Sequence, residues 1–509
     1  MKVLHIVTGL GVGGAEQQLR LLLRRLRDRS VHCDVVALTE PGAVAEGIRA
    51  DGTRVVHLGM RGNRDLSALP RLVRLIRAGR YDLVHTHLYR ACVYGRIAAR
   101  LAGVRTVVAT EHSLGDRELE GRRLTPAVRA LYLATERLGT ATVAVSDTGA
   151  RRLRRWGVPR ARLHTVPNGI DADRFRFDPA ARAAVRARLD IAADAFVVGG
   201  VGRLVPGKRF GVLVEAVAHL PGVRLLLAGD GPERAELLAR AGALGAADRV
   251  RLLGACDGGA GAGGTRVPPA PAGVPGTPDV PGLLSAVDVC VSPSAEEAFG
   301  LAVLEALAAG LPVLYAACPA VEDLPPEQAP GARRVTGGPA ELARALRELH
   351  EEHEKRAAQD ARERPGGAPT PRLPVPAAVH HYDIARTAGE LLAVYRSALG
   401  TYGPPSADGT TAASKAIAPT VQAGEGTAAG AGRAVGTAPV GPAGTADAGH
   451  THGPATTAGA GRASGTAPTD AAGTAGAAGA CAAPSSIPAR TPPPLPSSPR
   501  SLFTPPTTR

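Results

Sequence analysis

The stretch GRLVPGKRF at residues 202–210 gathers three basic side chains in a short loop between two apolar segments. Its two glycines and the following Lys208 have the spacing of a phosphate-binding loop, which normally continues with a Ser or Thr that holds Mg²⁺. Arg209 stands at that position, so a further cation replaces the metal ligand. We therefore expect Arg203 and Lys208 to neutralise a diphosphate without a metal, with an ordinary basic turn as the alternative.

An acidic pair lies in the stretch SPSAEEAFGLAVLEALAAG, where a predicted strand leads into a predicted helix. Glu297 lies in the loop and Glu305 in the helix, so the two carboxylates can accept hydrogen bonds from sugar hydroxyls and from a ribose diol. The backbone amides of Phe299, Gly300 and Leu301 mark the helix start, where a phosphate binds readily. For either Glu alone, the alternative is an acid that caps and solvates a helix start.

The glycines in GLGVGGAE, residues 9–16, lie between the first predicted strand and the first predicted helix. They match the dinucleotide pattern GxGxxG, and Glu40 ends the second strand where a ribose-binding acid would lie. Taken alone, these residues indicate NAD. The pattern is a weak one, because any first helix that approaches an anion benefits from glycines there, and a dehydrogenase would leave the signals of the second half unexplained.

Near-continuous runs of Val, Ile and Leu alternate with amphipathic helical segments along most of the chain. Such strands are buried on both faces, so the pattern predicts parallel sheets covered by helices. The cycle starts again at FVVGGVG, which predicts two doubly wound α/β domains, residues 1–172 and 173–362. Composition predicts four further segments: a flexible insertion at 256–281, a Pro-rich linker at 363–378, an amphipathic helix at 379–400, and a disordered Ala/Gly/Thr/Pro-rich tail at 401–509.

Charge and composition restrict the classes of partner. The net charge of +14 favours anions, with a solvated basic surface and an anionic membrane surface as the two interpretations. Aromatic residues, at 3%, are too few to interleave with basic groups, so no nucleic-acid partner is expected. The six scattered cysteines suit a reducing compartment. The N-terminus leads straight into a strand and no apolar run reaches the ~20 residues of a membrane span, so we expect a cytoplasmic protein.

Five motifs, taken in order, resemble those of the family-four retaining glycosyltransferases. They are GGAE opening the first helix, VPNGID at the domain junction, GRLVPGKRF, GDGPER, and the pair of glutamates separated by seven residues. The resemblance covers residues 1–400 apart from the insertion and the linker. It implies the GT-B fold, in which two Rossmann-like domains face each other across a cleft that holds the active site.

The resemblance implies a role for each donor-side residue. Arg203 and Lys208 would hold the diphosphate as it leaves. Glu297 would contact the hydroxyls of the donor sugar and Glu305 the ribose. The amides of the helix start, which belong to Phe299, Gly300 and Leu301, would complete the donor site.

On the acceptor side, His112 in VVATEHS matches the family's cleft histidine, beside the transferred sugar. Gly13 and Gly14 would bring the N-terminus of the first helix close to both the diphosphate and the acceptor, and so belong with the donor-binding residues. His85 and His87 in DLVHTH lie at another predicted strand end and are weaker candidates. The catalytic set implied is His112, Arg203, Lys208 and Glu297. Front-face attack needs no enzyme nucleophile, and neither a metal nor another cofactor is expected.

The predicted function is transfer of a sugar from a nucleoside-diphosphate sugar to a hydroxyl acceptor, with UDP as the favoured nucleotide. Synthesis of a cell-surface polysaccharide or glycolipid is the favoured setting, with peripheral contact at the inner face of the plasma membrane through Arg-rich helices. A small soluble acceptor, such as an inositol phosphate, is the alternative within this class. A sugar-nucleotide epimerase and a non-catalytic sugar-nucleotide-binding scaffold are the alternatives from other classes.

Overall fold

The computed structural model describes residues 1–115, 118–119, 122–256, 278–363 and 372–400. Most of the predicted insertion 256–281, the middle of the predicted linker 363–378, and the whole predicted tail 401–509 lie outside the described residues. Predictions that fall on those segments stay predictions. Within the described residues, no helix combines the length and the apolar composition needed to cross a membrane.

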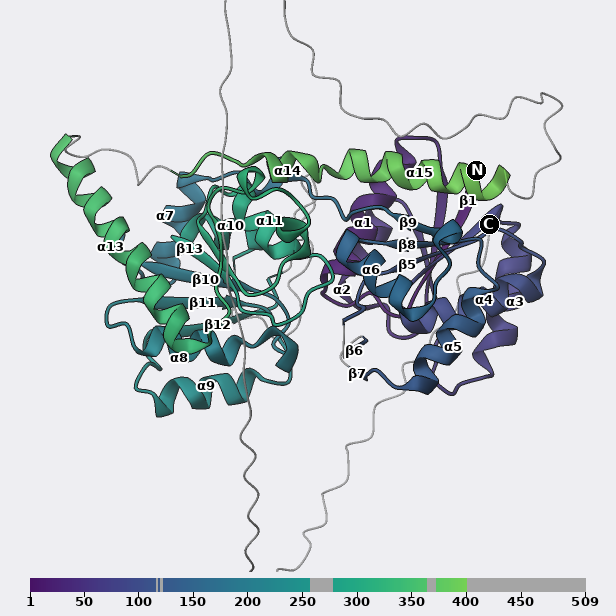
Figure 1. The fold of residues 1–509 in the computed structure, drawn as a ribbon, viewed down its shortest axis with the longest axis horizontal. Coiled ribbons are helices and arrows are strands. Elements are labelled where there is room, and N and C mark those ends of the chain that lie inside the picture. The colour runs from purple at the N-terminus through teal and green to yellow at the C-terminus, as the bar shows by residue number, and fades with distance from the viewer. Residues whose placement is uncertain (116–117, 120–121, 257–277, 364–371, 401–509) are drawn as a thin grey trace, which may run out of the picture. The chain divides into compact units, whose positions relative to one another are not determined.

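The first lobe, residues 2–165, is built on a sheet of seven parallel strands (Figure 1). The strand order is β3-β2-β1-β4-β5-β8-β9, so the chain moves outward from β1 to one edge and then returns to the other. The strands are β1 Lys2–Val7, β2 His32–Ala37, β3 Arg54–His57, β4 Leu83–His87, β5 Val107–Glu111, β8 Ala141–Ala144 and β9 Leu163–Thr165.

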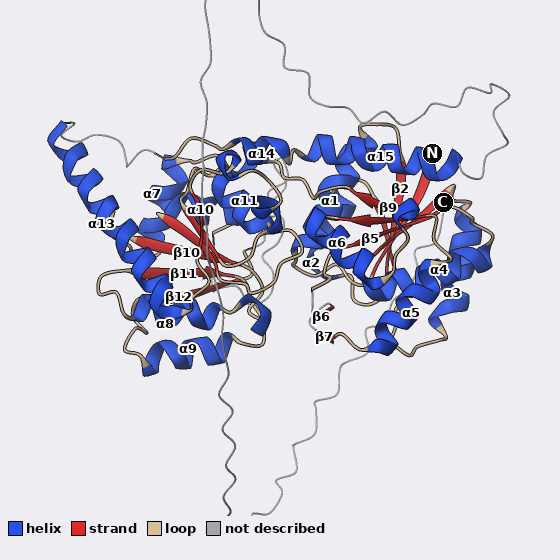
Figure 2. Cartoon of the chain, in the orientation of Figure 1, coloured by secondary structure: helices blue, strands red, loops and turns tan. Residues whose placement is uncertain are grey.

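Helices cover both faces of this sheet (Figure 2). Side chains alternate between the faces of a strand, so Val3 and Val7 of β1 belong to one buried cluster while Leu4 and Ile6 belong to another. A short antiparallel pair, β6 Glu118–Leu119 and β7 Arg122–Arg123, follows β5. The helices are α1 Gly14–Arg27, α2 Gly42–Ala50, α3 Ala68–Gly79, α4 Tyr89–Ala102, α5 Pro126–Glu136 and α6 Asp147–Trp156.

The second lobe, residues 179–363, repeats the architecture with six parallel strands in the order β12-β11-β10-β13-β14-β15. The strands are β10 Val197–Val201, β11 Arg224–Ala228, β12 Val250–Gly254, β13 Val289–Ser292, β14 Val313–Tyr315 and β15 Ala332–Arg334. The helices are α7 Pro179–Arg188, α8 Phe210–Ala218, α9 Arg234–Ala243, α10 Val280–Ala286, α11 Leu301–Ala308, α12 Pro319–Glu322 and α13 Pro339–Glu363. The predicted fold class, two doubly wound α/β domains, is confirmed, while the exact boundaries at 172 and 362 stay predictions.

A buried ion triad joins α7 to the start of β13. Asp288 accepts hydrogen bonds from Arg182 at 2.7 Å and from Arg186 at 2.8 Å, and its carboxylate also accepts one from the backbone amide of Val197 at 2.8 Å. All three charged side chains are at most 9% exposed. Because a carboxylate with several donors offsets its own desolvation, the triad fixes α7 against the sheet at the start of β10.

The chain returns to the first lobe after the second is complete. Two helices, α14 Ala377–His381 and α15 Ile384–Gly400, replace the single helix predicted over 379–400. The break lies at Asp383, whose carboxylate caps α15 by accepting hydrogen bonds from the amides of Ala385 and Arg386. The apolar face of α15 is buried in the same cluster as β1 and α1 of the first lobe.

Part of the predicted linker packs on the second lobe. The Arg372 guanidinium donates to the carbonyls of Ser285 and Val287, and it lies 4.4 Å from the centre of the Phe177 ring. The amide of Leu373 donates to the carbonyl of Gly310 at 2.9 Å. The described end of this segment is therefore attached to the lobe that it leaves.

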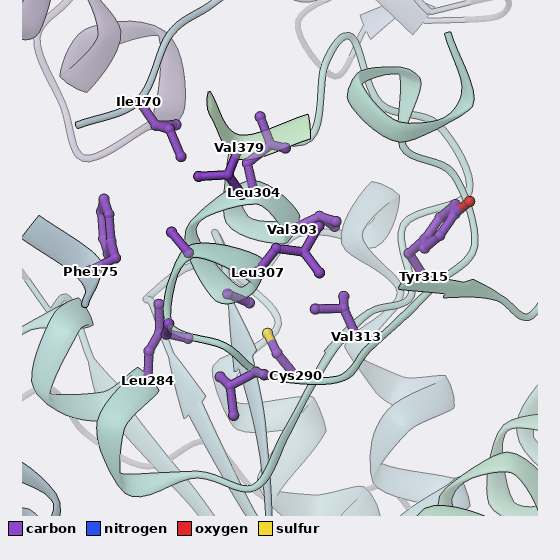
Figure 3. Packing of buried hydrophobic residues seen from close by; sticks show 14 of the residues in the cluster. Ile170, Phe175, Leu284, Cys290, Val303, Leu304, Leu307, Val313, Tyr315 and Val379 are labelled. Carbon is purple, nitrogen blue, oxygen red and sulfur yellow. The ribbon is translucent and has the colours of Figure 1, made fainter. Parts of the chain in front are cut away.

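Helix α11 lies in the centre of the second lobe's largest buried cluster (Figure 3). Its side chains Val303, Leu304 and Leu307 are at most 1% exposed, and they share the cluster with Cys290 of β13 and with Val379 of α14. A helix held on several sides moves little, so whatever its first turn binds is held with the same precision.

Candidate functional site

Strand β10 delivers the basic loop to the carboxyl edge of the second sheet. The loop continues as a short 3-10 turn, Pro206–Lys208, and Arg209 then takes a left-handed conformation, φ 52°, before α8 begins at Phe210. In open α/β sheets, ligands bind outside the carboxyl ends of the strands. The chain therefore carries Lys208 to the edge where the fold places a ligand.

Lys208 and Glu297 come together although they are far apart in the sequence. The Lys208 ammonium forms an ion pair and hydrogen bond with Oε1 of Glu297, which lies in the loop after β13. The Lys208 side chain is 28% exposed and that of Glu297 is 15% exposed, so both remain partly open to solvent. A ligand that carries both an anionic group and a hydroxyl group can replace this ion pair, because the anion can bind Lys208 and the hydroxyl can donate to Glu297.

The loop after β13 ends at the N-terminus of α11. Gly300 caps the helix with φ 108°, and a β-carbon there would lie 2.4 Å from the Sγ atom of Cys318. Only glycine fits both conditions, since it has no β-carbon and tolerates positive φ. Phe299 is buried and meets Tyr382 edge to face at 5.0 Å between ring centroids. The amides that begin at Leu301 therefore have a fixed position and suit an anion.

Glu305 lies one turn into α11 and its surroundings favour the neutral acid. Burial raises the pKa of its carboxyl group to about 7, while the charge of Arg174 acts in the opposite direction. A carboxyl group with this pKa exists in both protonation states near neutral pH. It can accept a hydrogen bond from a hydroxyl in either state.

Gly13 and Gly14 of the first lobe lie beside the N-terminus of α11. Gly13 caps α1 in an extended conformation, and a β-carbon on Gly14 would lie 3.3 Å from Cδ1 of Leu301. The first turns of α1 and α11 are therefore neighbours, and both present their N-terminal amides. Two helix N-termini together strengthen a site for negative charge.

Two residues that the sequence reasoning missed hold the acidic loop in place. The Ser146 hydroxyl donates to the carbonyl of Ala298 at 2.7 Å, and a guanidinium nitrogen of Arg152 donates to the carbonyl of Glu297 at 3.1 Å. Ser146 also caps α6, which its position before a helical segment could have indicated. Its second partner lies 152 residues away, and no local pattern reveals that contact.

Arg203 differs from the other predicted donor-site residues. It is exposed at the start of the loop, and its carbonyl accepts the amide of Val205 at 2.9 Å. Arg203 lies in the same loop as Lys208. Because the Arg203 side chain is exposed, a ligand can reach it. The structure thus brings Lys208 and Glu297 together, shortly before the start of α11.

His112 follows β5 directly and is 9% exposed. Its Nε2 atom lies 3.1 Å from Nδ1 of His87. The other ring nitrogen of His87, Nε2, lies 3.0 Å from Nδ1 of His5. Burial lowers the pKa of His112 to about 4, so its imidazole is neutral at neutral pH. The sequence predicts a role for His112 and offers His85 and His87 as weaker candidates, but it gives no signal for His5.

Comparisons with known proteins show which proteins this chain is similar to. The sequence profile of Glycosyltransferase Family 4 matches residues 12–174, and two profiles of Glycosyl transferases group 1 match residues 181–260 and 267–352. EpsF of Bacillus subtilis, a glycosyltransferase by its name, is 29% identical over 324 residues, which are 62% of this chain and 78% of that protein. The D-inositol 3-phosphate glycosyltransferase of Thermobispora bispora is 32% identical over 319 residues, 58% of this chain and 68% of that protein.

The structure of HepE from Anabaena in complex with UDP and glucose superposes with a TM-score of 0.62 at 24% identity, covering 78% of this chain and 100% of that one. That likeness is one of fold, and the fold is GT-B. The matched profiles and the named relatives define the class, which is a glycosyltransferase. Within that class, the chain belongs to glycosyltransferase family 4, with a second half of the glycosyl transferases group 1 type.

Proposed function

We propose that this glycosyltransferase moves a sugar from a UDP-sugar to a hydroxyl acceptor, with retention of configuration and without a metal. The observation that carries the proposal is the ion pair between Lys208 and Glu297 beside the first turn of α11. It brings together a cation, a carboxylate that can accept hydrogen bonds from sugar hydroxyls, and the N-terminal amides of α11, which are the groups that a nucleotide sugar requires. An epimerase or a binding scaffold would share this donor site, and the transfer assay below separates them from the proposal.

The chemistry follows from which groups the site offers. The bond between the sugar carbon and the diphosphate oxygen breaks, and the acceptor oxygen bonds to that carbon from the same face. The acceptor's proton passes to an oxygen of the departing diphosphate, so no separate base is needed. Lys208, Arg203 and the helix amides stabilise the charge that develops on the leaving group, and positioning supplies the rest.

The nucleotide and the acceptor are inferred from different observations. UDP is supported by HepE, a fold relative whose structures hold UDP with glucose and UDP-glucose. A cytoplasmic enzyme working on a membrane-bound acceptor is supported by α6, which exposes Arg151, Arg154 and Arg155 for contact with anionic lipid. A soluble inositol phosphate is a second candidate acceptor, favoured by the similarity to the D-inositol 3-phosphate glycosyltransferase.

Calorimetric titration of the full chain with UDP, GDP and ADP, in EDTA and in Mg²⁺, tests the donor site. We expect UDP to bind equally well with and without metal. Lys208→Ala should weaken UDP binding by about 10- to 100-fold, the loss of one charge-assisted hydrogen bond. Lys355→Ala is the matched control, because Lys355 is an exposed lysine on α13. Binding only of ADP or GDP, or only with Mg²⁺, would refute the proposal.

Turnover tests the reaction. Incubation with UDP-glucose and UDP-N-acetylglucosamine, together with anionic vesicles carrying glycolipid or with inositol phosphate, should release UDP only when one of the acceptors is present. The product linkage, read by NMR, should keep the donor's anomeric configuration. An epimerised sugar nucleotide formed without acceptor would identify an epimerase, and UDP-sugar binding with no turnover on either acceptor would favour a scaffold.

A further inference from the structure

Four histidines gather in the carboxyl half of the first sheet, where one of them, His85, contacts Tyr395 of α15. His5 of β1 pairs in register with His85 of β4, and His87 lies two residues further along the same strand. These three side chains are at most 2% exposed. His112 completes the group at the end of β5. Such a density of imidazoles in an apolar sheet needs a reason, because a buried polar ring must find partners.

The hydrogen bonds divide the four rings into two sets. One set is a chain of three, in which His5 Nδ1 lies 3.0 Å from His87 Nε2 and His87 Nδ1 lies 3.1 Å from His112 Nε2. We call His5, His87 and His112 the histidine chain. His85 is separate, since its two nitrogens contact the Tyr395 hydroxyl at 2.6 Å and the Thr110 hydroxyl at 2.7 Å.

The three rings of the histidine chain are neutral at neutral pH. Burial lowers the pKa of His5 to about 3 and that of His112 to about 4. Burial, with the charges of the neighbouring histidines, lowers the pKa of His87 well below its usual range. A neutral imidazole carries one N–H and one bare nitrogen, so each ring can donate once and accept once.

Counting protons leaves two arrangements. Three neutral rings hold three protons, and each of the two hydrogen bonds uses one. The third proton must lie at one end of the histidine chain, on His5 Nε2 or on His112 Nδ1. Neither of these atoms has a hydrogen-bond partner within the described residues.

The two ends differ in their surroundings. His5 is 0% exposed in the interior of the sheet, where an N–H without a partner is rarely tolerated. His112 is 9% exposed at a strand end, on the edge where ligands bind in this fold. Both end atoms are buried among the described residues. Only the His112 end lies at the edge where ligands bind, so the unshared proton costs less there once a bound ligand oxygen accepts it.

We propose that the histidine chain locks His112, which the resemblance already places beside the transferred sugar, as the Nδ1–H tautomer, so that its Nδ1 atom can only donate a hydrogen bond to an oxygen of the bound ligand. His5 and His87 are positioning residues, because each donates its own Nδ1–H to the next ring. The inference rests on the proposed function for the identity of the ligand. It also excludes neutral His112 as a base through Nδ1, which is consistent with a reaction in which the leaving diphosphate takes the proton.

The same cluster meets the spacing of a metal site, since one nitrogen from each of His5, His85 and His87 lies within 4.8 Å of the others. The hydrogen bonds argue against that use. Both nitrogens of His85 and both of His87 already have partners, and a metal would have to displace them. Tightly bound Zn²⁺ in the purified protein, lost on His85→Asn substitution, would overturn the proposal.

The tautomers can be read directly. Long-range ¹H–¹⁵N correlation spectra of the full chain labelled with ¹⁵N-histidine distinguish protonated from bare ring nitrogens, and single His→Gln variants assign the signals. We expect His5, His87 and His112 all to be protonated at Nδ1 and bare at Nε2 at pH 7.5. Any of the three protonated at Nε2, or carrying both protons, would overturn the proposal. Exposed His57 serves as a reference for an unconstrained ring.

Two substitutions of nearly equal size, His87→Asn and His87→Asp, test the positioning role of His87. His87→Asn keeps an N–H near the place of Nδ1, so His112 Nε2 should stay bare. His87→Asp offers only an acceptor there, so His112 Nε2 should become protonated. The ratio of UDP-glucose affinity to UDP affinity should fall about five- to tenfold in His87→Asp, as for a lost or redirected hydrogen bond, and should be rescued by His87→Asn.

The outcomes separate this proposal from the proposed function. If neither UDP nor UDP-glucose binds but the three Nδ1–H tautomers are present, the proposed function fails and the tautomer lock stands. If UDP binds but His112 Nε2 carries the proton in the wild type, the lock fails alone. Equal spectra of His112 in His87→Asn and His87→Asp would show that His87 does not determine the tautomer of His112, and this too would overturn the proposal.

Discussion

Replacing His5 by Asn should make the first lobe less sensitive to acid. In the folded protein His5 is neutral, because burial lowers its pKa to about 3, while the unfolded chain takes up a proton at about 6.5. The folded pKa is the lower one, so stability is complete above pH 6.5 and is lost as the pH falls toward 3. Asn does not titrate, and its amide can keep the hydrogen bond to His87.

The magnitude follows from the two pKa values. Between pH 7.5 and pH 5.0 the folded His5 stays neutral, while in the unfolded chain it is protonated below its pKa of about 6.5. The two states therefore differ by one proton over about 1.5 pH units, from pH 6.5 to pH 5.0. At about 1.4 kcal/mol per unit, the wild type loses about 2 kcal/mol that the variant keeps. Glu305, whose pKa is raised to about 7, has the opposite dependence, and it cancels when the wild type is compared with the variant.

Urea unfolding followed by tryptophan fluorescence measures this difference. The chain has one tryptophan, Trp156, which is 7% exposed in the first lobe and so reports on the lobe that contains His5. Free energies by linear extrapolation at the two pH values give the loss for each protein. His57→Asn, at an exposed position of β3, should lose as much as the wild type. Equal losses in wild type and His5→Asn would refute the buried neutral state of His5.

Three further changes test the packing around the site. Asp288→Asn should destabilise the second lobe by about 3 to 5 kcal/mol, because its two arginine partners stay buried without their carboxylate; urea unfolding monitored by circular dichroism measures the loss. Gly229→Ala should lower the melting temperature and weaken UDP binding, because the new β-carbon would lie 1.8 Å from the carbonyl oxygen of Gly202 at φ 138°; an unchanged melting curve would contradict that contact. Tyr395→Phe should cost about 1 kcal/mol of stability by removing the hydrogen bond to His85, and preserved stability would show that the hydroxyl is dispensable.

The sequence was sufficient for the two parallel sheets, since their central strands are buried, unbroken apolar runs. It was insufficient for β9 and β15, which have three residues each, partly exposed and with no apolar run to mark them. The edge strands are held by backbone pairing with a neighbour, and that pairing depends on the tertiary fold. The capping of α15 by Asp383 could have been expected from the acid before a helical pattern.

The residues of the candidate site could be predicted where each of them belongs to a single sequence motif. Lys208 and Glu297 each lie in a recognisable loop, and the structure adds that they meet. The histidine chain was not predictable, because it depends on the register between β1 and β4, which places His5 beside His85. Ser146 and Arg152 were missed for a similar reason, since the partners that they hold, Ala298 and Glu297, lie in a loop of the second lobe.

The return of α15 to the first lobe sets an order for folding during synthesis. A ribosome delivers every strand of the first sheet before it reaches the second lobe, and N-terminal domains generally begin to fold as they emerge. The face that carries His5 and His85 nevertheless waits for Tyr395, which is translated 310 residues after His85. The lobe that is made first is therefore the one completed last, and a nascent chain stopped before Ile384 leaves that apolar face uncovered for a chaperone to bind.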